Sequence, residues 1–371
     1  MINPTLAEMA AYPFVRLEEK RRELVARGVE VIDFGKGDPN EPTDPMIRRA
    51  LVEALPERAP YPLAAGLPEL REAAARWCAR RFGVDVDPDT EIVPTYGAKE
   101  AIFSLAQVLV DPRSDKRVVA YGEPAYPVYE RGALFAGAEP RPLPLLCGNG
   151  FMLDVDALDD EVAIVWVNYP HNPTGAVAPL SFYEELTEAA ERHDFVIASD
   201  EAYTELWFDE PPPSALQVAD RSRVIAFQTL SKRSSMTGYR SGFVAGPAEL
   251  IAALKAYRPT VGTAPQEFVQ RASVVAWGDE RHVEETRARY RAKRGVLLPA
   301  LERKGWEVVA SRATMYLWVI APDDAAERLL ERGVIVSPGE FFGPSGAGYL
   351  RLALVPTLED CERAAAILEA A

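Results

Sequence analysis

The feature that most constrains the fold is an alternation of short apolar segments and helical patterns between residues 92 and 257. Apolar runs such as EVAIVWV (161–167) are followed by helix-like stretches such as SFYEELTEAAERH (181–193). Apolar strands separated by helices indicate a parallel or mixed sheet with helices on both faces. Ligands of such sheets bind beyond the carboxyl ends of the strands. The candidate loops are therefore 95–99, 122–127, 168–175, 200–203 and 229–240.

The pattern changes after about residue 285. A charged helical stretch over 279–304 precedes short apolar runs such as YLRLALV (349–355), which indicate a smaller α+β unit. A helix expected at 15–28 is predicted to join it, since chain termini often lie close together. We expect three parts: an N-terminal segment (1–40), a large domain (41–285) and a small C-terminal domain (286–371).

Charge and composition exclude several classes of function. The 371 residues carry a formal net charge of −15, which argues against nucleic acid or an anionic membrane as a partner. Three distant cysteines without a CxxC indicate neither disulfides nor a metal site. Because neither a signal-like N-terminus nor a long apolar stretch occurs, we expect a cytoplasmic protein without a membrane span.

One lysine, Lys232, stands in a glycine-spaced segment rich in hydroxyl residues, TLSKRSSMTGYRSG (229–242). By itself it could be a surface lysine. It could also form a Schiff base, which requires a lowered pKa. Arg240 would disfavour a second positive charge and could bind a phosphate. Thr229 and Ser231 offer hydroxyl groups to the same anion.

Two further strand ends carry polar groups. Gly97, in YGAKE, permits a tight turn before a helix whose first N–H groups could bind phosphate, although any strand–glycine–helix junction looks similar. Asp200 ends the strand IASD and could cap a helix or hold a pyridine nitrogen protonated. Tyr203 could then reach a phenolic oxygen on the same ring.

Three other residues allow both a structural and a functional interpretation. Asn172, in NPTG, belongs either to a simple turn or to a rigid loop that holds its amide. Tyr126, between prolines, could pack in the core or stack on a flat cofactor. Arg351, on a predicted strand, needs either a salt bridge or a carboxylate ligand. Together these residues supply an amine, a group of anion-binding donors, a carboxylate, an aromatic ring and an arginine that could bind a carboxylate.

The motifs NYPHNPTG, SDEAY, and SK followed by GYRSGF resemble those of fold-type I pyridoxal-phosphate (PLP) aminotransferases of the aspartate aminotransferase superfamily, class I/II, from about residue 10 onward. The resemblance implies an α/β fold: a large domain with a mixed, mostly parallel sheet covered by helices, plus a smaller α+β domain. It also implies ping-pong transfer of an amino group between an amino acid and a 2-oxo acid, and a homodimer with active sites at its interface.

The resemblance also assigns roles to residues. Lys232 would be the catalytic lysine, and Gly37, Asn172 and Arg351 would bind the substrate. Tyr61 would be lent to the phosphate site of the partner subunit. The cofactor-binding set would be Tyr61, Ala98, Lys99, Tyr126, Asn172, Asp200, Tyr203, Thr229, Ser231 and Arg240.

The stretch SKRSSMTGYRSGFVAG is similar to one in N-succinyldiaminopimelate aminotransferases of lysine biosynthesis. It predicts transfer from N-succinyl-LL-2,6-diaminopimelate to 2-oxoglutarate, with Arg233 and Arg258 as candidates for binding distal carboxylates. The alternatives are a general aspartate, alanine, aromatic or LL-diaminopimelate aminotransferase, and a PLP C–S β-lyase. A PLP-binding transcription regulator is disfavoured because the PLP-binding region starts early and the chain is acidic.

Overall fold

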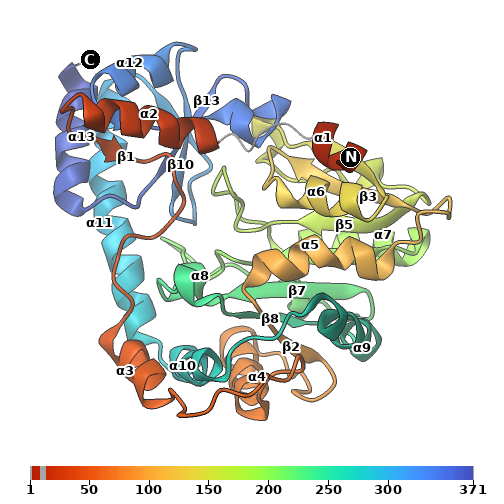
Figure 1. The fold of residues 1–371 in the computed structure, drawn as a ribbon. Helices are drawn as coiled ribbons and strands as arrows, with labels where there is room; N and C mark the ends of the chain where they lie inside the picture. The colour runs from red at the N-terminus through yellow and green to blue at the C-terminus, as the bar shows by residue number, and fades with distance from the viewer. Residues whose placement is uncertain (1, 9–13, 371) are drawn as a thin grey trace.

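The computed structural model describes residues 2–8 and 14–370, in a larger unit built on one sheet and a smaller unit packed against it (Figure 1). The predicted segment 1–40 and the likeness from about residue 10 fall partly outside the described residues. A short helix, α1 (Pro4–Glu8), precedes the gap.

The sheet of the larger unit has the strand order β2-β8-β7-β6-β5-β3-β4. Strands β7, β6, β5, β3 and β4 are parallel, whereas β8 is antiparallel to both of its neighbours. This mixed, mostly parallel sheet confirms the predicted fold class. Its strands are β2 (Ile92–Thr95), β3 (Val118–Glu123), β4 (Glu139–Pro144), β5 (Val162–Val167), β6 (Val196–Asp200), β7 (Val224–Thr229) and β8 (Gly242–Ala245).

Helices cover both faces of this sheet, and each face has its own apolar core. One core contains Trp77, Phe243 and Trp277, and the other contains Leu105 and Phe227. Burial on both faces explains why the strands are apolar throughout rather than alternating. The helices are α3 (Pro45–Glu53), α4 (Pro68–Phe82), α5 (Ala98–Leu109), α6 (Val128–Phe135), α7 (Leu180–His193), α8 (Leu230–Arg233), α9 (Ala248–Tyr257) and α10 (Glu267–Gly278).

The edge strand β4 was not expected from its sequence, EPRPLP. Proline lacks the N–H group that a central strand needs, so a proline-rich run argues against a strand. β4 pairs only with β3 and has exposed or half-exposed residues. An edge position tolerates the missing donors.

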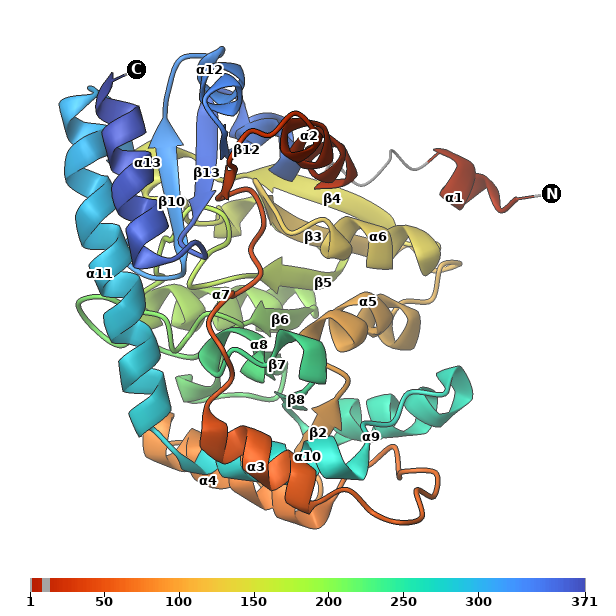
Figure 2. The same ribbon diagram turned by 60° about the vertical axis from the view of Figure 1, so that its left-hand side comes forward.

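The smaller unit contains an antiparallel sheet of order β12-β13-β10-β9 and a parallel pair, β1 with β11. Ile32 and Phe34 belong to its core, together with Leu352. Helix α11 runs along both units and across the predicted boundary at residue 285 (Figure 2). The elements are α2 (Phe14–Ala26), β1 (Ile32–Asp33), α11 (Arg281–Arg303), β9 (Glu307–Val309), β10 (Tyr316–Ile320), α12 (Ala325–Glu331), β11 (Val334–Ile335), β12 (Ser337–Pro338), β13 (Tyr349–Ala353) and α13 (Leu358–Ala370).

The segment between β1 and α3 connects the two units, and both views show it crossing from one to the other (Figures 1 and 2). Its first turn is tied down in the smaller unit, where the Gly35 carbonyl oxygen accepts hydrogen bonds from Ser337 Oγ (2.7 Å) and Arg351 Nη2 (2.9 Å). Farther along, the Gly37 carbonyl oxygen accepts from Lys232, so the segment passes the carboxyl end of β7.

A substitution at Gly242 would measure how tightly the neighbouring ends of β2, β7 and β8 pack. Gly242 pairs with Thr95 on β2 and Thr229 on β7, and an added Cβ would clash with the Gln228 carbonyl oxygen. We expect Gly242→Ala to lower the free energy of unfolding by about 1–3 kcal/mol. Gly295→Ala, on α11 where a Cβ meets nothing within 4 Å, should instead stabilise by about 0.5–1 kcal/mol. Urea denaturation measures both, and equal midpoints would contradict the packing described.

Candidate active site

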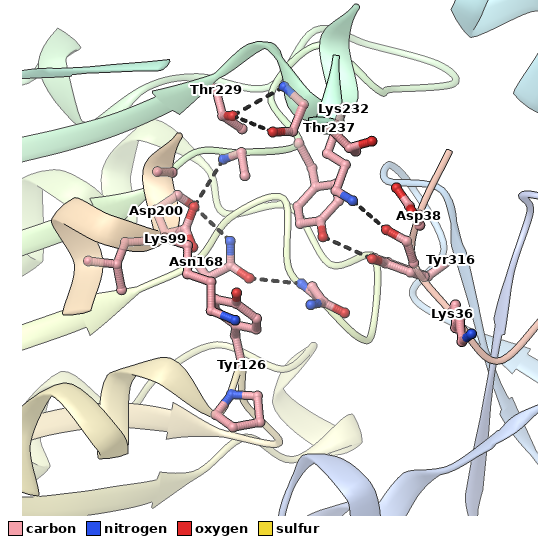
Figure 3. A pocket seen from close by; sticks show the side chains of 18 of the residues that line it. Lys36, Asp38, Lys99, Tyr126, Asn168, Asp200, Thr229, Lys232, Thr237 and Tyr316 are labelled. Carbon is pink, nitrogen blue, oxygen red and sulfur yellow. Dashed lines mark hydrogen bonds between the residues drawn. The ribbon is translucent and has the colours of Figure 1, made fainter. Parts of the chain in front are cut away.

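A cavity of about 550 Å³ is lined by both units (Figure 3). Tyr61 is fully exposed and does not line it. The other predicted site residues all line the cavity: Gly37, Ala98, Lys99, Tyr126, Asn172, Asp200, Tyr203, Thr229, Ser231, Lys232, Arg240 and Arg351.

Lys232 lies on the short helix α8, directly after β7. The helix starts at Thr229, whose hydroxyl caps it by accepting from the Ser231 amide (3.1 Å). The ammonium group of Lys232 donates to the Gly37 carbonyl oxygen. The pKa of Lys232 is lowered to about 8, chiefly by burial; the charge of Asp38 opposes this shift, and the charges of Arg351 and Arg240 contribute to it. A fraction of this amine is therefore uncharged, and nucleophilic, near neutral pH.

An anion pocket forms where α5 begins. Gly97 (φ 71°) precedes the helix and leaves no room for a side chain, because an added Cβ would lie 2.5 Å from Arg240 Nη2. The guanidinium group is also held by the Thr237 carbonyl oxygen (2.8 Å). A helix N-terminus facing an arginine attracts anions, through free N–H groups and through charge. The hydroxyl groups of Thr229 and Ser231 line the same cavity.

Asp200 ends β6 with its carboxyl group buried. Its Oδ2 accepts from Tyr129 Oη (2.7 Å) and its Oδ1 from the Ala202 amide (3.2 Å). Burial raises the pKa of Asp200 to about 6, and these two hydrogen bonds oppose the rise. The carboxylate is thus a strong acceptor for any proton-bearing group that enters the cavity.

Two asparagines and two tyrosines fix the middle of the cavity. The side chain of Asn168 donates to the Asp200 carbonyl oxygen (2.7 Å) and accepts from the backbone N–H of Asn172 (2.9 Å). It therefore joins β6 to the loop after β5. The peptide bond between Asn172 and Pro173 is cis. The hydroxyl groups of Tyr203 and Tyr316 are 2.9 Å apart.

Arg351 reaches the cavity from β13 of the smaller unit. It is 3% exposed, and its guanidinium group donates to Asn172 Oδ1 (3.1 Å) and the Gly35 carbonyl oxygen. It also lies 4.3 Å from the ring centre of Tyr316 and 4.5 Å from that of Phe342. A planar guanidinium group that lines the cavity suits a carboxylate, which it can bind through two parallel hydrogen bonds.

Several lining residues were missed from the sequence. Lys36 and Asp38 follow β1 in a Gly/Pro-rich loop that resembles an ordinary connection, and only the contacts of Gly35 and Gly37 bring them to the cavity. Other lining residues that were missed include Asn168, Tyr316 and Phe342. Asn168 follows a strand end, which was a usable signal.

Arg233 and Arg258, expected to bind distal carboxylates, are buried elsewhere and do not line the cavity. Arg233 pairs with Glu280 (2.8 Å) and donates to the Ala276 carbonyl oxygen (2.7 Å). Arg258 pairs with Glu100 (3.3 Å). Both expectations were wrong because sequence proximity to Lys232, or a loop position, does not show where a long side chain points.

Two kinds of feature are absent from the residues that the structure describes. In that part of the chain no helix is long and apolar enough to cross a membrane. Over the same ranges, no group of His, Cys, Asp and Glu side chains is arranged to hold a metal ion.

Comparison with known proteins covers nearly the whole chain. The family model for class I and II aminotransferases matches residues 29–368. LL-diaminopimelate aminotransferase of Aquifex aeolicus is 41% identical over 377 residues, which cover 96% of this chain and 97% of that protein.

Solved structures agree in fold. Aspartate aminotransferase of Thermus thermophilus with maleate has a TM-score of 0.91 at 32% identity, over 100% of this chain and 99% of that one. A probable N-succinyldiaminopimelate aminotransferase of the same organism has a TM-score of 0.89 at 32% identity, over 96% and 99%. The chain therefore belongs to the class I and II aminotransferases and is a PLP-dependent enzyme of that family.

Proposed function

We propose that this aminotransferase uses LL-2,6-diaminopimelate as its amino donor and that the residues lining the cavity hold PLP and the donor as follows. The observation that carries the site assignment is that Lys232, Asp200 and Arg351, from three separate elements, share one cavity with an anion pocket. The donor assignment rests on the relatives and on the charges opposite Asp200.

The residues present fit PLP. The N–H groups of Ala98 and Lys99, the hydroxyls of Thr229 and Ser231, and Arg240 would bind its phosphate. Asp200 would accept from the ring nitrogen, Tyr203 and Asn172 would hold the phenolic oxygen, and Tyr126 would stack on the ring. Bound PLP supplies an electron sink for the bond broken at the donor Cα.

Lys232 has two tasks in this proposal. Its amine would hold the cofactor, and the free amine would then act as general base toward the proton on the donor Cα and afterwards as general acid. Arg351 and the Gly37 backbone would orient the donor carboxylate so that this proton faces Lys232 Nζ.

The proposed donor is supported by the charged residues that line the cavity and by the identity of the relatives. Lys36 and Asp38 line the cavity on the side opposite Asp200 and Lys99 (Figure 3). LL-diaminopimelate has a distal ammonium and a distal carboxylate, which would face Asp38 and Lys36; the Lys36 ammonium also pairs with Glu18 of α2. Curated relatives 36–41% identical to this chain are LL-diaminopimelate aminotransferases.

The N-succinyl donor is the second candidate. It is favoured by the likeness around Arg233 and by the Thermus neighbour. It has no distal ammonium for Asp38, and Arg233 makes its bonds to Ala276 and Glu280 away from the cavity. Both points support the free diamine over the succinylated form.

A homodimer completes the proposal. An apolar groove of about 950 Å³, lined by Phe103, Phe135 and Val261 among others, shares Lys99 and Arg240 with the cavity. Tyr61 is fully exposed, as expected of a residue that a partner would cover. A second copy seated on the groove would bring Tyr61 of the partner subunit to the phosphate site.

The pKa of Lys232 predicts how cofactor loading depends on pH. Only the uncharged amine attacks PLP, so the rate of loading into ligand-free protein should rise with pH and reach half its maximum near 8. Asp38→Asn removes the charge that raises this pKa, so its midpoint should lie lower. Stopped-flow absorbance measures the rate, with Lys232→Ala as the blank. A midpoint near pH 10 that is the same in the wild type and in Asp38→Asn would contradict the role assigned to Lys232.

Donor specificity can be measured by amino-group transfer to 2-oxoglutarate. We expect kcat/KM for LL-diaminopimelate to exceed that for its N-succinyl derivative by tenfold or more. A tenfold difference corresponds to about 1.4 kcal/mol in transition-state binding free energy. In Asp38→Asn, the ratio of LL-diaminopimelate to aspartate activity should fall about tenfold, because only LL-diaminopimelate has a distal ammonium, which loses its charged partner. A preference for the succinylated donor would overturn the proposal, and net release of pyruvate from C–S substrates would indicate a lyase.

Sharing of Tyr61 between subunits predicts complementation. Lys232→Ala and Tyr61→Ala chains should each be impaired as homodimers. Their mixed dimer has one site with an intact Lys232 and an intact Tyr61 of the partner subunit, so mixing should restore up to half of the wild-type activity per dimer. No gain above the average of the two variants would show that Tyr61 does not act across the interface.

A further inference from the structure

Tyr129 is the one side chain that hydrogen-bonds the Asp200 carboxyl group among the described residues. It lies in the first turn of α6, one helical turn after Tyr126, and is 3% exposed. Neither the sequence motifs nor the roles proposed above account for it. Its hydroxyl, 2.7 Å from Asp200 Oδ2, does not line the cavity.

The direction of this hydrogen bond is determined. Burial and the neighbouring charge of Asp200 raise the pKa of Tyr129 well above its ordinary value. Tyr129 therefore keeps its proton and donates it, and the carboxylate accepts. A hydrogen bond to the charged form of an acid favours that form.

The aromatic ring of Tyr129 is held in place by its neighbours. It stacks on Trp166 of β5, with ring centres 5.0 Å apart and planes at 16°. It also meets Tyr126 edge-on, at 5.9 Å and 80°. A rotamer change would break the contacts of this close-packed ring and cost free energy. The hydroxyl group therefore stays directed at Asp200.

The surroundings of Asp200 contain few other groups that could hold its charge. Burial favours the neutral acid, and the groups opposing it are the Tyr129 hydroxyl and the Ala202 amide. The other titratable groups around the pair include Tyr203, from the segment after β6, Tyr126, from the segment before α6, and Tyr121 of β3. All three are phenols.

We propose that Tyr129 is a positioning residue that keeps Asp200 ionised, so that a proton shared with the cofactor's ring nitrogen lies on the nitrogen and not on the carboxylate. This rests on the role proposed for Asp200. Without the Tyr129 hydroxyl, the carboxylate becomes the stronger base and takes the proton from the nitrogen. The ring then loses its positive charge, and with it part of its electron-withdrawing power.

The first test uses ligand-free protein. Carbon-13 NMR of labelled aspartate, with Asp200→Asn to assign the signal, follows the protonation of Asp200. Tyr129→Phe should raise the pKa of Asp200 by about one unit or more, as expected for a lost hydrogen bond to a charge. Tyr121→Phe is the matched control, since its ring adjoins Tyr129 at 6.4 Å without a bond to Asp200, and it should leave that pKa unchanged.

The second test uses protein loaded with nitrogen-15-labelled PLP. The nitrogen signal should be that of a protonated ring in the wild type and in Tyr121→Phe, and should move toward the neutral ring in Tyr129→Phe. A shift in Asp200→Asn but none in Tyr129→Phe would overturn the role of Tyr129 alone. No shift in either would instead refute the role of Asp200.

A more conservative change covers the case in which Tyr129→Phe fails to fold. 3-Fluorotyrosine at position 129 keeps the ring and strengthens the donor, so the pKa of Asp200 should move down instead of up. Opposite shifts in the two variants are expected for a hydrogen bond that controls protonation. A change in melting temperature with no shift in either signal would mean that Tyr129 serves packing only.

Discussion

The accumulation of positive charge in one cavity is the constraint on which the rest of the site depends. Lys232 lies close enough to Arg240 and Arg351 for both to lower its pKa, and the N-terminus of α5 adds a partial positive charge. Such a cluster is costly until anions enter it. A phosphate at one end and a carboxylate at the other would offset that cost, and between them the lysine stays partly uncharged. The cluster therefore suits a phosphate group and a carboxylate group that are bound at the same time.

The fold meets this constraint by drawing the cations from separate elements. Lys232 and Arg240 flank the turn between β7 and β8, whereas Arg351 comes from β13 of the smaller unit. The segment after β1 lies between them, and its Gly35 and Gly37 carbonyl oxygens accept from Arg351 and Lys232. A donor carboxylate that takes over these bonds would link the two units through the substrate itself.

Much of this could be predicted from the sequence because several site residues of the larger unit stand at or just after a recognisable strand end. Asp200 closes an apolar run, and Lys232 stands beside glycine and hydroxyl residues. The sequence could not show long side chains turning inward: Arg233 was assigned to the substrate, yet it pairs with Glu280. It also could not show Tyr129, because a tyrosine on an apolar helix face looks like packing until the distance to a carboxylate is known.

A crystal structure of the PLP-loaded protein would show whether the cavity holds the cofactor as proposed. We predict a covalent bond from Lys232 Nζ to the cofactor, and the ring nitrogen within hydrogen-bonding distance of Asp200. The phosphate should lie at the start of α5 beside Arg240, within reach of Tyr61 of the partner subunit. A cofactor bound in the opposite sense, with its phosphate at Arg351 and its ring nitrogen away from Asp200, would contradict the account.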